Sequence, residues 1–312
     1  MATPLPLYLD CDTGIDDAIA LAYLVGHEGI ELAGIGTVSG NVSAAEAARN
    51  TSALLRAIGR AGIPVAIGEH DPLHGEYDGG APHVHGTNGI GEVELEPGAD
   101  AVAETAPEML VRLARELGGQ LSVLAIGPLT NIARALELEP ELPRLVSRLT
   151  VMGGAVWAPG NITSFAEANI ANDPEAARIV LGAGFSLALV PLDVTLQHRF
   201  DDDDAVRLEQ RGTGLHVALG RMLRRYIDFY EQVGLPRESP LHDPLAAAIA
   251  SREVAGTEVR KVVLEVVLDG EERGRTVPSA ADGVESPAVD VVVGADAGAA
   301  EAIRRRIHSL AV

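Results

Sequence analysis

Four carboxylates stand within eight consecutive residues near the start of the chain: Asp10, Asp12, Asp16 and Asp17. The apolar run 5–9 before them predicts a buried strand, and residues 18–25 after them have the composition and spacing of a helix. The acids therefore fall at the end of a first strand and the start of a first helix. In an open α/β sheet, ligands bind at that position.

The spacing of these acids indicates a bound cation. Like charges packed this closely repel one another unless a positive group joins them, and carboxylate oxygens are ligands that Ca²⁺ prefers. Helix capping would explain Asp16 or Asp17. It would leave Asp10 and Asp12 unexplained, because alternation along a strand places both on the same side. We therefore expect a metal or substrate site here, with Ca²⁺ as the simplest ion.

The triplet His242, Asp243 and Pro244 is ambiguous by itself. Proline just inside a helix, with aspartate as the cap, is an ordinary structural motif. The triplet becomes a functional candidate only if its helix start faces the acidic cluster.

Two loops carry polar side chains that could contact a ligand. Asn161, Glu167 and Asn169 could together hydrogen-bond a polyhydroxylated molecule, although asparagines also serve loops by making local turns. His83 and His85 have the spacing of two ligands on a strand, but a zinc site would need a third or fourth nitrogen or sulfur ligand. Contact with substrate and simple exposure are both open for these histidines.

Strand-like and helix-like segments alternate through the first two thirds of the chain. The predicted strands cover residues 5–9, 30–38, 63–67, 121–126, 149–152 and 186–192. The predicted helices cover residues 18–25, 43–58, a segment ending at 135, and 174–181. This pattern predicts an α/β fold with an open, mostly parallel central sheet and helices on both faces.

The last third of the chain does not continue this alternation of strands and helices. The acidic run 201–204 indicates a solvated helix start, and helices are expected up to residue 230 and over 243–250. Residues 262–268 predict a strand that enters a hairpin turn at 269–270. A strand over 288–293 and a closing C-terminal helix over 297–307 follow, and no linker divides the chain, so we expect one domain over 1–312.

Two long stretches, 68–103 and 153–172, interrupt the alternation with glycine, proline and small polar residues. A long loop without secondary structure in a compact domain is usually functional or disordered. We therefore expect these two loops to contact a ligand or, for part of the first, to lack order.

Composition excludes several classes of protein. The formal net charge is −21, so the basic face that nucleic-acid binding needs is not expected. No stretch approaches the ~18 apolar residues of a membrane span, and no signal sequence is evident, which predicts a cytoplasmic protein. Cys11 is the only cysteine, and we expect a small strand-end residue rather than a nucleophile.

These segments, taken in order, resemble the nucleoside hydrolases, in particular the inosine-uridine-preferring group. The family's D-x-D-x-x-x-D-D opening is similar to residues 10–17, and its V-x-G-N, H-x-H-G, G-x-L-T-N and M-G-G segments match 38–41, 83–86, 127–131 and 152–154. Its N-x-T-S-x-A-E-x-N-I, D-P-E-A and H-D-P segments match 161–170, 173–176 and 242–244. The resemblance covers nearly the whole chain.

The resemblance implies a Ca²⁺-dependent enzyme that cleaves the N-glycosidic bond of purine or pyrimidine ribonucleosides by direct attack of a metal-bound water, giving ribose and free base. The implied catalytic residues are Asp12 as general base and His242 on the departing base. The implied metal ligands are Asp12, Asp17, Asp243 and the carbonyl of Thr130. The implied substrate-binding residues are Asp16, Asn41, His85, Met152, Asn161, Glu167 and Asn169. A homodimer or homotetramer is implied as well.

Two positions depart from the family pattern. Thr13 stands where the family often has proline, and Ala168 stands where it often has a phenylalanine near the 5′ side of the ribose. The second change opens the pocket, so the preferred base stays open. The resemblance also leaves open which of Tyr226, Phe229 and Tyr230 contacts the base.

Two other functions compete with this one. A haloacid-dehalogenase-type phosphatase also opens with two aspartates after a strand, as D-x-D-x-[TV], but Thr13 follows Asp12 directly and the match fails by one residue. A non-catalytic Ca²⁺-dependent ribose binder would need the same metal site. The presence of both Asp12 and His242 argues against that binder.

Overall fold

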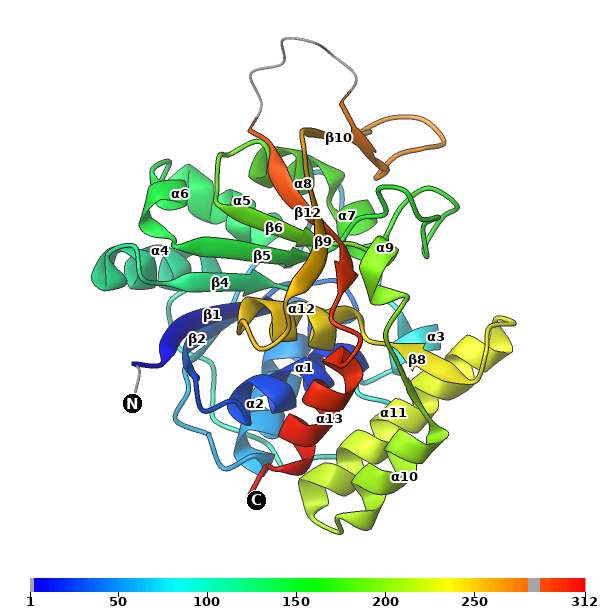
Figure 1. Cartoon of the computed structure of the whole chain (residues 1–312). Coiled ribbons are helices and arrows are strands. Elements are labelled where there is room, and N and C mark those ends of the chain that lie inside the picture. The colour runs from blue at the N-terminus through cyan, green and yellow to red at the C-terminus, as the bar shows by residue number, and fades with distance from the viewer. Residues whose placement is uncertain (1–2, 280–286, 312) are drawn as a thin grey trace.

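A central sheet of eight strands organises the computed structural model, which describes residues 3–279 and 287–311 (Figure 1). In spatial order the strands are β3 (Val65–Ile67), β2 (Ile30–Thr37), β1 (Leu5–Cys11), β4 (Ser122–Ala125), β5 (Arg148–Met152), β6 (Leu187–Val190), β12 (Val289–Ala295) and β9 (Gly256–Val262). All neighbours pair in parallel except β12 and β9, which are antiparallel. The order reverses between β1 and β4, so a ligand-binding crevice is expected at their carboxyl ends.

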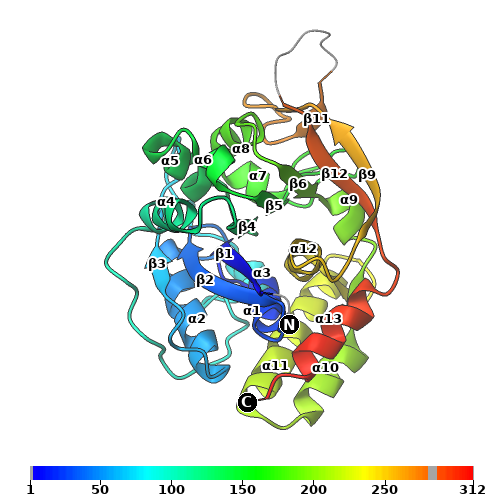
Figure 2. The same ribbon diagram turned by 60° about the vertical axis from the view of Figure 1, so that its left-hand side comes forward.

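Helices cover both faces of this sheet, as the view in Figure 2 makes clear. One face packs on α1 (Ile15–Val25), α2 (Ala44–Ala57), α11 (Gly214–Gln232), α12 (His242–Ala250) and α13 (Ala299–His308). The other face packs on α4 (Ala106–Leu117), α5 (Thr130–Leu138), α6 (Leu142–Leu145) and α8 (Pro174–Leu181). Each face has its own buried aliphatic core, and the predicted α/β class is confirmed.

The remaining elements lie around the carboxyl edge of the sheet and its periphery. They are the helices α3 (Pro82–His85), α7 (Ala168–Asn172), α9 (Leu192–Thr195) and α10 (Asp202–Gln210). Two small ribbons pair β7 (Arg199–Asp201) with β8 (Glu238–Pro240), and β10 (Leu264–Val266) with β11 (Thr276–Pro278). In the part of the chain that the structure describes, no helix is both long and apolar enough to span a membrane.

Several predictions about elements need correction. His83 and His85 lie on the single helical turn α3, so they are not neighbours on a strand. The expected strand 262–268 is divided between β9 and β10, although the hairpin turn that follows is confirmed. The acidic run does start a helix, but Asp204 is buried and forms an ion pair with Arg304 at 2.5 Å, so only part of the run is solvated. Helix α4 was not predicted.

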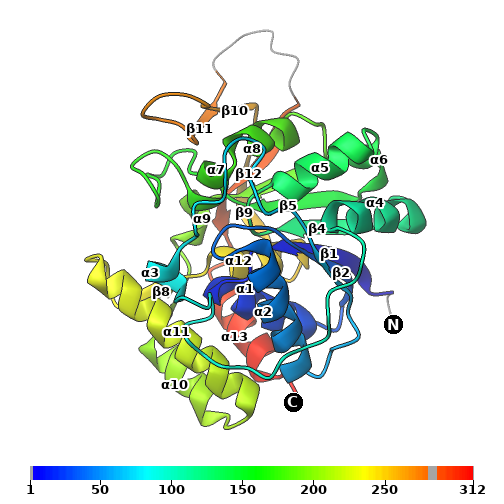
Figure 3. The same cartoon turned by 180° about the vertical axis from the view of Figure 1, so that it is seen from behind.

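The first long loop is held against the body of the protein. Its residues between α3 and α4 run across α2, as Figure 3 shows from behind. Arg56 on α2 donates to the carbonyl of Pro97 at 2.8 Å. A Cβ atom at Gly98 would lie 2.0 Å from the carbonyl oxygen of Ser52, so this close approach requires glycine.

Glycine is also required on β2, where this strand packs against the core that contains α4. A Cβ atom on Gly36 would lie 2.0 Å from the Tyr8 hydroxyl and 2.8 Å from the Cβ of Ala106. That hydroxyl is buried and donates to the Ala106 carbonyl at 3.0 Å.

We therefore expect Gly36→Ala to lower the free energy of unfolding by about 1–3 kcal/mol, the usual cost of overpacking a core. Urea denaturation would measure it. Gly62→Ala is the matched control, because nothing lies within 4 Å of its added Cβ. Equal stability of the two variants would contradict the close contact at Gly36.

Candidate active site

Three carboxylates from distant parts of the sequence meet at the carboxyl edge of the sheet. Asp16 and Asp17 lie in the first turn of α1, and Asp243 lies in the first turn of α12. One oxygen from each lies within 4.8 Å of the others, and all three side chains are buried. The two helices pack against each other, so their amino-terminal ends bring these acids together.

Asp17 fixes the turn between β1 and α1. Its Oδ2 accepts from the Gly14 amide at 2.7 Å and its Oδ1 accepts from the Asp12 amide at 3.2 Å. Burial raises the pKa of Asp17 well above its usual value, and the nearby Asp12 carboxylate raises it further. Asp17 therefore both caps the start of α1 and belongs to the acidic cluster.

Asp12 lies at the same turn and faces the segment that follows β2. Its Oδ2 accepts from the Asn41 amide at 2.7 Å, while its Oδ1 is buried with no hydrogen-bond partner. Burial raises the pKa of Asp12 to about 7. A Cβ on Gly40 would lie 2.1 Å from Oδ2, so the V-x-G-N segment needs glycine to approach this carboxylate.

Asp16 has one paired and one unpaired oxygen. The Tyr226 hydroxyl donates to Oδ2 at 3.2 Å, and Oδ1 is buried without a partner. Burial raises the pKa of Asp16 to about 7, with Asp17 as the next cause. For Asp243, burial raises the pKa well above its usual value, and the three other aspartates add to this. A cation would relieve both the burial and the repulsion.

The fourth acid of the opening segment has a different environment. Asp10 is inside β1 and accepts from the side-chain amide of Asn131 at 2.9 Å. Asn131 also donates to the carbonyl of Thr37 and accepts from the amide of Glu69. These bonds fix the residue next to Thr130, whose hydroxyl donates to Asp173 at 2.7 Å. Asp10 and Asp173 thus hold the start of α5 from two sides.

His242 is buried between two hydroxyl groups. Thr195 at the end of α9 contacts its Nδ1 at 2.8 Å, and Tyr230 of α11 contacts its Nε2 at 3.1 Å. Burial lowers the pKa of His242 to about 4. The imidazole of the unliganded protein is therefore neutral near pH 7.

His85 is fixed by the start of α1. Its Nδ1 accepts from the amide of Ile15 at 3.1 Å, so the ring is a neutral donor at Nε2. Burial lowers the pKa of His85 to about 3. Its ring lies 5.4 Å from that of Tyr226. His83 is exposed and its ring contacts Phe229 edge-on at 6.0 Å.

Of the three candidate residues in the second long loop, Glu167 and Asn169 are buried and Asn161 is exposed. The side-chain amide nitrogen of Asn169 donates to the backbone carbonyls of Ile126 and Met152. The side-chain amide oxygen of Asn169 therefore faces away from those partners. Glu167 accepts from three backbone amides as the cap of α7, and burial raises its pKa. Asn161 is exposed and accepts from the Ala168 amide at 3.0 Å.

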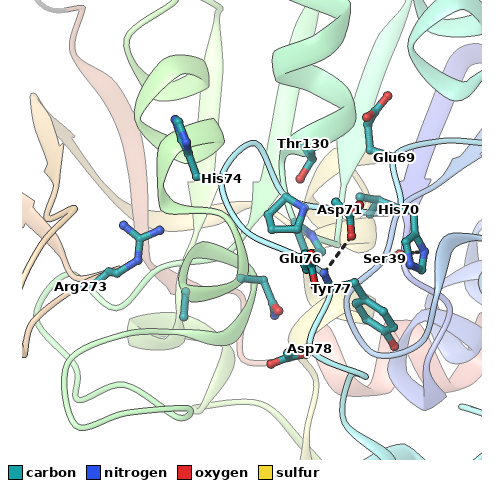
Figure 4. A pocket seen from close by; sticks show the side chains of 15 residues that line it. Ser39, Glu69, His70, Asp71, His74, Glu76, Tyr77, Asp78, Thr130 and Arg273 are labelled. Atoms are coloured by element: carbon teal, nitrogen blue, oxygen red, sulfur yellow. Dashed lines mark hydrogen bonds between the residues drawn. The ribbon is translucent and has the colours of Figure 1, made fainter.

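A hollow of about 210 Å³ lies between the first long loop and the start of α5 (Figure 4). Thr130 and Ser39 form part of its wall, and the loop supplies Tyr77, whose pKa burial raises to about 12. The amide of Ala81 donates to the Asn41 carbonyl at 3.0 Å, which fastens the loop to the turn beside Asp12.

The sequence pointed to the acids and to His242 but not to the residues that hydrogen-bond to the site from behind. Asn131, Asp173 and Thr195 were not singled out. Thr195 had one usable signal, since it is a polar residue shortly after the predicted strand 186–192, where ligands are expected.

Comparison with known proteins identifies the family. The family model described as inosine-uridine preferring nucleoside hydrolase matches residues 7–302. The chain belongs to the inosine-uridine-preferring nucleoside hydrolase family. It is therefore an N-ribohydrolase, an enzyme that acts on ribonucleosides.

Named relatives of this nucleoside hydrolase differ in the bases they take. Uridine nucleosidase 1 of Arabidopsis thaliana is 34% identical over 258 residues, which cover 82% of this chain and 77% of the relative. The pyrimidine-specific ribonucleoside hydrolase RihA of Enterobacter sp. (strain 638) is 36% identical over 78% of each chain. The solved purine-preferring ribonucleoside hydrolase from Gardnerella vaginalis has a TM-score of 0.93 and 31% identity, with 98% of each chain covered.

The buried carboxylates predict how the stability of the metal-free nucleoside hydrolase depends on pH. The pKa values of Asp12 and Asp16 are about 7 when folded and 3.8 ordinarily, so the folded state binds more protons between these values. Their contribution to stability is therefore complete below about pH 4 and is lost as the pH rises through about 7.

Urea denaturation in chelator at several pH values would measure this slope. Asp16→Asn should make it shallower, while Asp100→Asn, at an exposed position, should leave it unchanged. An identical slope for Asp16→Asn and the native sequence would contradict the raised pKa.

Proposed function

We propose that this nucleoside hydrolase is Ca²⁺-dependent and transfers water to the anomeric carbon of ribonucleosides, releasing ribose and the free base. The observation that best supports this proposal is that a carboxylate oxygen of Asp243, far away in the sequence, lies within 4.8 Å of oxygens of Asp16 and Asp17. A cluster that has only oxygen donors suits Ca²⁺, which takes six to eight oxygen ligands.

The donor set fits a hard cation. Asp12 and Asp16 each keep a buried oxygen without a partner, although buried polar atoms are normally hydrogen-bonded. We assign Asp12, Asp17, Asp243 and the Thr130 carbonyl as ligands. The three carboxylates within 4.8 Å of one another include Asp16 in place of Asp12, so Asp16 is a further candidate ligand of the same ion. When bound, Ca²⁺ would lower the pKa of a coordinated water and position it.

The polar residues around the cluster suit a ribose. Asp16, Asn41 and Asn169 would hold the 2′- and 3′-hydroxyls, because the Asp16 Oδ1 and the amide oxygens of the two asparagines remain able to accept. Glu167 and Asn161 would hold the 5′-hydroxyl. Met152 and His85 would line the pocket beside the sugar and the base.

The reaction then divides between two groups. Asp12 would take a proton from the attacking water, since its carboxylate lies at the proposed ion site and keeps one buried oxygen without a partner. The base would leave with the electron pair of the N-glycosidic bond, through an oxocarbenium-like transition state that the surrounding carboxylates stabilise. Neutral His242 would donate a hydrogen bond from its N–H to the departing base, which then takes its proton from solvent water. Direct attack inverts the anomeric carbon.

Uridine is the substrate that the comparisons favour. The curated relatives described above are a uridine nucleosidase and a pyrimidine-specific hydrolase, while the solved relative is purine-preferring. The ring pair Tyr226 and Tyr230, with centroids 5.1 Å apart, lies beside His85 and His242 and would contact the base.

The first test is base release from uridine, cytidine, inosine and adenosine, with and without chelator. We expect uracil from uridine, loss of activity on complete removal of Ca²⁺, and recovery on adding it back. Inorganic phosphate from sugar phosphates would instead favour the phosphatase, and tight ribose binding without turnover would favour the binder. Full activity without Ca²⁺ would overturn the metal role.

The second test separates the two catalytic roles. Asp12→Ala should abolish turnover of every ribonucleoside, because the base and one metal ligand are both lost. His242→Ala should lower kcat for uridine and inosine by about 10²–10⁴-fold, the usual range for acid–base groups. It should affect 4-nitrophenyl riboside much less, because nitrophenolate leaves without help. Equal losses on both kinds of substrate would contradict the assignment of His242 to the departing base.

A further inference from the structure

A chain of hydrogen bonds connects Thr195 to the acidic cluster through three side chains. Thr195 contacts Nδ1 of His242 at 2.8 Å, and Nε2 of His242 contacts the Tyr230 hydroxyl at 3.1 Å. Tyr230 then contacts the Tyr226 hydroxyl at 3.4 Å, and Tyr226 contacts Asp16 at 3.2 Å. All five residues are buried.

The direction of every bond in this chain follows from its acidic end. The Tyr226 hydroxyl donates its single proton to Oδ2 of Asp16. The Tyr226 oxygen then accepts the single proton of Tyr230. Because Tyr230 has no second proton, its oxygen must accept from Nε2 of His242. The proton of the imidazole is therefore on Nε2.

The hydrogen-bonding role of the other ring nitrogen follows from this assignment. A neutral imidazole has one donor and one acceptor, so Nδ1 of His242 accepts. The Thr195 hydroxyl must then be the donor. Thr195 is fully buried at the carboxyl end of α9, directly after β6, and its amide donates to the Pro191 carbonyl. The backbone of α9 thus directs this hydroxyl at one nitrogen.

We propose that Thr195 is a positioning residue for His242, and that its hydroxyl keeps the imidazole in the Nε2-protonated tautomer with its N–H toward the tyrosine pair. The consequence for catalysis rests on the proposed function, in which this N–H serves the departing base. Without the hydroxyl, Nδ1 loses its donor, and the ring can change tautomer or rotate. The N–H would then point away from Tyr230 for part of the time.

Kinetics of two variants test the role. Thr195→Val keeps the shape and removes the hydroxyl, and Thr195→Ser keeps the hydroxyl. We expect Thr195→Val to lower kcat for uridine about 10- to 100-fold, part of the range for an acid–base group, with KM and Ca²⁺ affinity within about twofold. Turnover of 4-nitrophenyl riboside should change by less than about threefold. Thr195→Ser should recover most of the kcat.

A matched control and a second readout separate positioning from folding. Thr150→Val makes the same substitution at another buried threonine, on β5, and should keep the native kcat. If Thr195→Val and Thr195→Ser lose activity equally, and on both kinds of substrate, Thr195 is only structural. If Thr195→Val retains full activity on uridine, the inference is wrong while the proposed function stands.

Nitrogen NMR of histidine-labelled protein decides the tautomer without reference to activity. Two-bond proton–nitrogen correlations distinguish the protonated from the unprotonated ring nitrogen, and the His242→Gln spectrum identifies the signals. We expect Nε2–H in the native protein and in Thr195→Ser, and a mixture in Thr195→Val. A native protein with Nδ1–H would overturn the inference. Absence of turnover on every nucleoside would overturn the proposed function and leave this spectrum interpretable.

Discussion

Repulsion among buried carboxylates is the constraint on which the site depends. Asp16, Asp17 and Asp243 meet in a buried space where the donors that face them are backbone amides, an asparagine and a tyrosine. Such neighbours do not neutralise charge. The packing of α1 on α12 and the turn after β1 hold the acids in place despite their repulsion. Burial, and after it the repulsion between neighbouring aspartates, raises the pKa values of Asp16 and Asp243, and a bound cation would counter both effects.

The strands that contribute to the site are neighbours in the sheet. Asp12 and Thr130 follow the carboxyl ends of β1 and β4, Met152 is the last residue of β5, and β6 leads into the short helix that contains Thr195. The strand order reverses at β1 and β4, so helices leave the sheet in opposite directions and leave a crevice there. The fold therefore gathers residues from four consecutive strand ends without any of them being close in sequence.

The sequence predicted the parallel sheet and the acidic cluster because both have strong local signals. Apolar runs that alternate with helical segments indicate the sheet, and four acids after the first run indicate a ligand site. Local signals could not place His83 and His85 on a helical turn, because two alternate histidines suit either structure. They also could not identify Asn131 or Asp173, since a buried polar side chain is recognisable only once its long-range partners are known.

The distance along the chain between α1 and α12 has a consequence for biosynthesis. During translation the segment with Asp12, Asp16 and Asp17 leaves the ribosome long before Asp243 does, and contacts between residues far apart in sequence form late. A nascent chain that ends before α12 contains the first acids without the helix that packs against them. Under the proposed function, the ion site is therefore complete only once α12 has been synthesised, and a polypeptide that ends before α12 would lack one of its ligands.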